Sequence, residues 1–75
     1  MKSASFTYYG SSEDKNRTVR LIQNSAGSYT IDIEGMPALT QTTPSKMRAE
    51  EIFQGWWEMA WKDWGASDID WSDWR

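Results

Sequence analysis

The side chains best able to do chemistry lie in residues 56–75. This segment holds all six tryptophans and five of the eleven carboxylates of the 75-residue chain. Its five acidic and two basic side chains sum to −3, which is the net charge of the whole chain. Indole rings supply large apolar contact areas, and carboxylates select basic partners and speed their approach. The chemistry indicated by this segment is therefore recognition rather than covalent change.

Residue types that most catalytic sites need are absent. The chain has no histidine and no cysteine, which removes the usual general base, thiolate nucleophiles and the commonest metal ligands. A chain of 75 residues also has little material for a closed pocket around a substrate. We therefore predict a protein that is not an enzyme, with no catalytic residues and no cofactor.

Aspartates near residue 70 raise the question of a metal site. Asp68, Asp70 and Ser72 match the first three odd positions of a calcium-binding EF-hand loop. That loop needs glycine at the next position, where this chain has Asp73. We therefore predict no calcium site there, and no other metal site.

The tryptophans divide according to their positions on an expected helix. Trp56 and Trp64 fall on its apolar side and are predicted to be core, whereas Trp57 and Trp61 fall at the edge of that side. Tryptophan anchors many protein interfaces. We expect another protein, with a basic surface, to bind a surface formed by Trp57, Trp61, Trp71, Trp74, Asp68, Asp70 and Asp73.

The pattern Trp-x-Asp-Trp occurs twice, in residues 61–64 and 71–74. A four-residue pattern recurring in so tryptophan-rich a segment is weak evidence, and we interpret it as coincidence or as repeated packing. The alternative is a two-part aromatic and acidic surface.

Two other functions stay open. The order of three strands and one helix is that of small DNA-binding domains that read DNA with a sheet, and Arg17 and Arg20 would lie on the open face. Phosphate binding needs a basic surface, however, and this chain is acidic, so we do not expect nucleic acid as the partner. The other alternative is a structural domain that forms homo-oligomers.

Alternation of apolar and polar residues predicts three strands in the first half of the chain. Phe6 and Tyr8, then Val19 and Leu21, then Tyr29, Ile31 and Ile33 would each form an apolar face. The short connection 24–27 predicts a hairpin with Gly27 in a left-handed conformation, and short links favour an antiparallel sheet.

A helix is predicted from about Pro44 to Trp64, with Thr43 as its N-cap and Gly65 after its end. Gly55 would lie in the middle of the helix, where it would permit a close neighbour. The expected core-facing side of this helix consists of Ala49, Ile52, Phe53, Trp56, Met59, Ala60 and Trp64.

These elements define one α+β domain over residues 1–75. It comprises an antiparallel sheet of three strands, with the option of a fourth, packed against one C-terminal amphipathic helix, in the order β-β-β-α with an extended C-terminal tail. We expect residues 66–75 to fold back on the domain, as a fourth strand or an extended clasp. No segment has the length or apolarity of a membrane span or of a signal peptide, so a cytoplasmic location is expected. The size is also that of accessory or inhibitor proteins of phages and other mobile elements.

Overall fold

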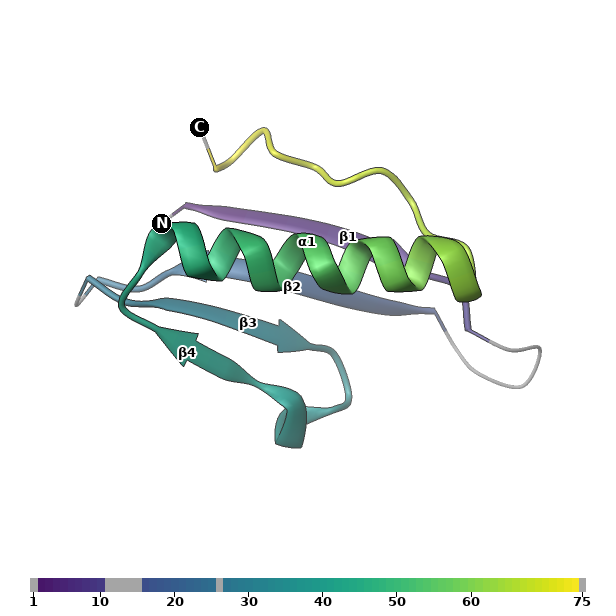
Figure 1. Ribbon diagram of the computed structural model, residues 1–75, viewed down its shortest axis with the longest axis horizontal. Coiled ribbons are helices and arrows are strands. Elements are labelled where there is room, and N and C mark those ends of the chain that lie inside the picture. Colours follow the sequence, from purple (N-terminus) through teal and green to yellow (C-terminus); the bar gives the residue numbers. More distant parts are fainter. Residues whose placement is uncertain (1, 11–15, 26, 75) are drawn as a thin grey trace.

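Four strands and one long helix form a small α+β fold in the computed structural model, which describes residues 2–10, 16–25 and 27–74. Strands β1 (Ser3–Tyr8), β2 (Arg17–Gln23), β3 (Tyr29–Ile33) and β4 (Gln41–Thr43) form one antiparallel sheet in sequence order. A short 3-10 helix, η1 (Pro37–Leu39), connects β3 to β4, and helix α1 (Lys46–Asp63) follows. Figure 1 shows α1 running along the strands. The predicted fold class is confirmed.

The period-two pattern of the strands places the apolar residues on one face of the sheet. Phe6 on β1 pairs with Val19 on β2, which pairs with Ile33 on β3. A second buried row of the same kind consists of Ala4, Leu21 and Ile31. Helix α1 covers these rows with the buried side chains of Ala49, Phe53 and Ala60.

The fourth strand is β4, which the sequence did not predict as a strand. Gly35 has a φ of 78°, and Pro37 starts η1, so the chain reverses after β3 and returns along its edge. Thr43 in β4 pairs with Tyr29 in β3. Strand β4 has three residues, which are too few to show an alternating pattern in the sequence.

Pairing of Thr43 also explains why α1 begins later than predicted. The N-cap is Ser45, whose Oγ accepts a hydrogen bond from the Arg48 backbone N–H at 3.1 Å, and the first helical residue is Lys46. The prediction of Thr43 as the cap is therefore wrong. At the other end, Trp64 is the C-cap and Gly65 has a φ of 82°, as expected.

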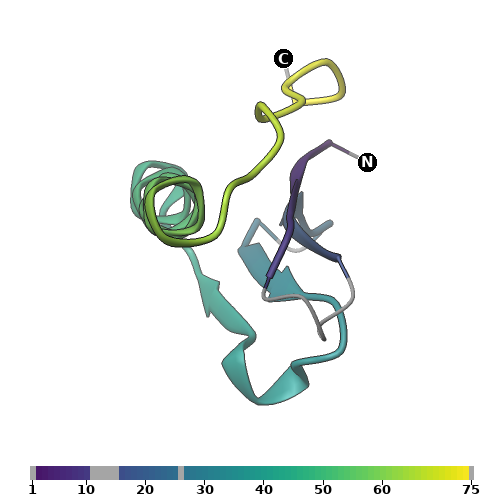
Figure 2. The ribbon, with the colours of Figure 1, turned by 90° about the vertical axis from the view of Figure 1, so that its right-hand side faces the viewer.

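Residues 66–74 return along the free edge of β1, as the end-on view in Figure 2 shows. Every second backbone N–H of this edge donates to this segment or to Gly65: Ser3 to Asp73 O, Ser5 to Asp70 O, Thr7 to Ser67 Oγ and Tyr9 to Gly65 O. The segment makes two isolated bridges, Ser5↔Asp70 and Tyr8↔Ala66, rather than a further strand. It satisfies donors that an exposed sheet edge would offer to other chains.

Three details of the predicted helix packing are wrong. Met59 is 42% exposed and Trp64 is 47% exposed, although both were predicted to be core. Both lie toward the C-terminal end of the helix, where Trp64 packs on Tyr8 with ring centroids 5.4 Å apart and keeps its other side in solvent. Gly55 has no close neighbour, because a Cβ built there would meet nothing within 4 Å. No helix in the described residues is long and apolar enough to cross a membrane.

Candidate functional site

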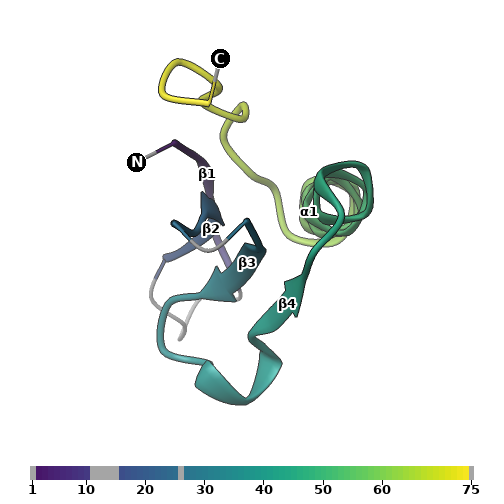
Figure 3. The ribbon, with the colours of Figure 1, turned by 90° about the vertical axis from the view of Figure 1, so that its left-hand side faces the viewer.

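Several of the predicted partner-binding residues meet in a shallow groove between α1 and the C-terminal segment. Gln54, Trp57 and Glu58 line it from the helix, and Asp68, Ile69 and Trp71 line it from the segment. Its volume is about 350 Å³. We refer to these six residues as the helix–tail groove. It exists because residues 66–74 turn back beside α1, a placement that Figure 3 shows end-on.

Trp57 is held in place at one wall of the groove. Its Nε1–H donates to the Ser67 backbone oxygen at 2.8 Å, which ties the helix to the C-terminal segment. The ring stacks on Trp61 one turn later, with centroids 5.7 Å apart and an interplanar angle of 21°. Trp61 is 57% exposed. The pair therefore forms an ordered aromatic surface, with its outer ring in solvent.

Trp71 connects the groove to the core. Its ring meets that of Phe53 edge to face, with centroids 5.7 Å apart, and Phe53 in turn packs on Phe6 of the sheet. Trp71 is half-buried. A ring fixed by packing loses little conformational entropy when a partner covers its remaining surface.

The groove carries two carboxylates that form no direct ion pair with a described residue. Glu58 and Asp68 are exposed, and neither forms an ion pair with a described residue. Their charges lie beside Trp57 and Trp71 in the groove lining. A cation bound there would gain both Coulomb attraction and contact with an aromatic face.

The other two predicted aspartates have structural contacts. Asp70 Oδ1 accepts hydrogen bonds from the Ser72 backbone N–H at 3.0 Å and from Ser72 Oγ at 2.6 Å. The hydroxyl bond first, and the backbone bond second, lower the pKa of Asp70. Asp73 is exposed, and its backbone oxygen accepts from Ser3 N. Asp70 thus shapes a turn, and neither residue lines the helix–tail groove.

Trp74 does not lie on the surface, so the prediction that it contacts a partner is corrected. It is 4% exposed, and its ring packs edge-on against Tyr29. Its Nε1–H donates to Glu50 Oε2 at 2.9 Å, and Lys46 Nζ lies 5.6 Å from the ring centroid. Glu50, which the sequence did not single out, is the acceptor that allows this indole to be buried.

Burial also separates the two Trp-x-Asp-Trp copies. In residues 61–64 both rings are about half exposed, at the end of α1. In residues 71–74 one ring is half-buried and the other is core. Identical patterns thus occupy different environments, and they do not form a two-part surface of equivalent halves.

Of the two arginines predicted to lie on the open face of the sheet, only Arg20 lies there, and its charge is paired. Arg20 makes a bidentate pair with Asp32, at 3.0 and 2.8 Å, and this hydrogen-bonded pairing raises the pKa of Arg20. Arg17 precedes Val19 by two residues in β2, so it lies on the helix-facing side and not on the open face as predicted, and its Nη1 donates to the Glu34 backbone oxygen. Neighbouring positions carry hydroxyl side chains, among them Thr7 and Thr18, whose oxygens are 3.5 Å apart.

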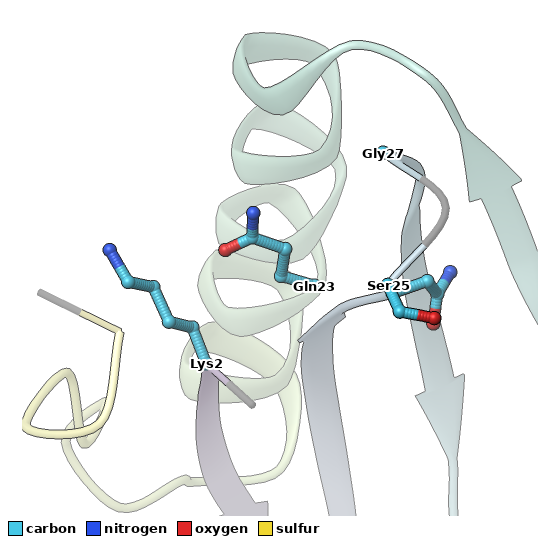
Figure 4. A pocket seen from close by; sticks show the side chains of 5 residues that line it. Lys2, Gln23, Ser25 and Gly27 are labelled. Carbon is cyan, nitrogen blue, oxygen red and sulfur yellow. The ribbon is translucent and has the colours of Figure 1, made fainter.

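A second depression lies at the β2–β3 turn, at the end of the molecule where α1 begins. Lys2, Gln23, Asn24, Ser25 and Gly27 line it, with a volume of about 530 Å³, and Figure 4 shows Lys2 and Gln23 pointing to the same side. Asn24 Nδ2 bonds to Ser28 and Thr30 hydroxyls and so is occupied in shaping the turn. One lysine remains there for recognition.

Comparison with protein-family models, with curated proteins and with solved structures found no match to this chain. Within the part of the chain that the structure describes, no three acidic side chains cluster as metal ligands would. The helix–tail groove is therefore assessed on its own geometry.

Proposed function

We propose that this protein is a non-enzymatic binding module that recognises a basic segment of another protein through the helix–tail groove. One observation carries the proposal: two half-buried indoles share one groove with two carboxylates that form no direct ion pair with a described residue. Arginine or lysine would place its charge beside Glu58 and Asp68 and its aliphatic stem against Trp57 and Trp71.

The distribution of charge supports a basic partner. The segment that forms most of the groove carries the whole net charge of −3. A field of this sign attracts cationic segments and repels nucleic-acid phosphates. On the open face of the sheet, the charge of Arg20 is paired with Asp32, which leaves it less available to a nucleic-acid phosphate.

The test uses a synthetic arginine-rich peptide and a glutamate-rich peptide of equal length, with affinity measured by calorimetry at low salt. The protein should bind only the arginine-rich peptide. Glu58→Gln with Asp68→Asn should weaken binding about 2- to 30-fold, if each exposed pair contributes about 0.2–1 kcal/mol. The matched control, Glu34→Gln with Glu51→Gln, changes the net charge equally outside the groove and should bind as the parent does.

Trp61→Ala provides a second measurement. Because Trp61 is 57% exposed and its ring stacks on Trp57 of the groove, its loss should reduce peptide affinity while leaving the melting temperature within a few degrees of the parent. Equal losses in the groove variant and the matched control would show that only net charge matters, and equal binding of both peptides would show that charge does not select the partner. Either result would overturn the proposal.

A further inference from the structure

A second site lies on the opposite flank of α1, between the helix, the sheet and η1. This cavity has a volume of about 260 Å³. Its floor consists of five buried residues: Phe6, Tyr8, Val19, Ile33 and Ala60. Its rim consists of Met36, Leu39, Trp56 and Trp64. None of the nine carries a formal charge.

The helix sequence explains why the core is incomplete here. Trp56, Ala60 and Trp64 are spaced by four residues and therefore lie along one side of α1. Ala60, the small residue between two indoles, faces the sheet and leaves the space unfilled. The two large rings border the space from either side.

The connection between β3 and β4 leaves the cavity open on its other side. Figure 3 shows η1 turned away from α1, and Leu39, the last residue of η1, is 42% exposed. Met36 is half-buried against the core. Leu39 and Trp64 thus border the opening as half-exposed apolar side chains, where a well-packed core would enclose them.

We infer that this cavity is a binding site for a small, uncharged, apolar molecule with a flat ring system. A charged ligand would lose its hydration, and the aromatic faces of the lining would return only part of that cost for a cation and none of it for an anion. Apolar cavities of about 150 Å³ hold benzene, so the larger space here suits about two fused rings. Trp56, Trp64 and Phe6 supply aromatic walls, and Met36 can adapt its shape to the ligand. This inference is independent of the helix–tail groove.

Indole, an uncharged two-ring molecule, is the probe, and imidazolium is the charged comparison. The six tryptophan side-chain N–H groups, recorded by two-dimensional NMR, report separately on the two flanks of α1. Indole should shift the signals of Trp56 and Trp64 saturably, with a dissociation constant of about 1 mM or tighter. Imidazolium should leave these two signals in place.

Ala60→Leu is the decisive variant because it fills the cavity from its floor. It should weaken indole binding at least tenfold and should not lower the melting temperature, since the added atoms enter existing space. Ala49→Leu is the matched control, because Ala49 is fully buried outside the cavity and the larger side chain should lower the melting temperature. Leu39→Ala removes apolar contact at the rim and leaves the floor of the cavity intact, so it should weaken indole binding several-fold.

Three results would overturn the inference. The first is unsaturable binding, or indole binding by Ala60→Leu that equals that of the parent. The second is an equal shift of Trp57 and Trp71 in the same titration, which would indicate general adhesion to indoles. The third is a stable dimer that buries Leu39 and Trp64, which would make a second copy of the chain the occupant.

Discussion

Replacing Trp74 with alanine tests whether the C-terminal segment is part of the core. Trp74 is 4% exposed, packs against Tyr29 and donates a hydrogen bond to Glu50. Truncation of a buried tryptophan typically costs about 3–5 kcal/mol. At about 0.05–0.15 kcal/mol per residue, the total for 75 residues is about 4–11 kcal/mol. Trp74→Ala should therefore remove a large part of the free energy of unfolding.

Urea unfolding followed by far-ultraviolet circular dichroism measures this loss. Trp74→Phe removes the N–H donor and one of the two fused rings but keeps an aromatic ring, so its cost should lie between about 1 kcal/mol, for the lost hydrogen bond to Glu50, and the cost of Trp74→Ala. Trp61→Ala is the matched control, with an expected cost below about 1 kcal/mol at its exposed position. A cost below 1 kcal/mol for Trp74→Ala, or an equal cost for Trp61→Ala, would refute the burial argument.

Two further expectations concern a glycine pair and one carboxylate. Gly55→Ala should raise the free energy of unfolding by about 0.5–1 kcal/mol, because its Cβ enters open space in a helix. Gly35→Ala should lower it, since φ is 78° and the Cβ would meet the Arg17 guanidinium. A decrease for Gly55→Ala, or an increase for Gly35→Ala, in urea unfolding would contradict this. The pKa of Asp70 is lowered by folding, so the unfolded chain takes up the proton first as the pH falls past 3.8, and this part of the stability is lost in acid. Asp70→Asn should therefore show a shallower decline in stability below about pH 4.5 in acid titration, and an unchanged slope would contradict the assigned hydrogen bonds.

Strand alternation predicted the buried face of the sheet because each side chain's direction follows from its place in the strand. Val19 and Leu21 on β2, and Ile31 and Ile33 on β3, lie where the period-two pattern puts them. The same local reasoning placed Gly27 and Gly65 in left-handed conformations. It did not find β4, because pairing with β3 depends on where η1 returns the chain.

Helical spacing was less informative for the tryptophans. Angular position on the helix placed Trp64 in the core, and Trp74 of the C-terminal tail was assigned to a partner-binding surface; the structure reverses both. Exposure of a ring depends on what lies opposite it. Trp64 packs on Tyr8 at the margin of the core and stays 47% exposed, whereas Trp74 meets Tyr29 and Glu50, from elements far away in the sequence.

By itself, the sequence determined the fold class, the strand faces and the concentration of indole and carboxylate groups near residues 56–75. These features depend on residue type and short-range spacing, which act within one element. Tertiary structure alone decided that residues 66–74 cover the edge of β1, and that Glu58 and Asp68 share a groove with Trp57 and Trp71. It also decided that Ala60 leaves a cavity. These outcomes depend on which surfaces meet after the chain turns, and contacts between distant residues leave no periodic pattern in the sequence.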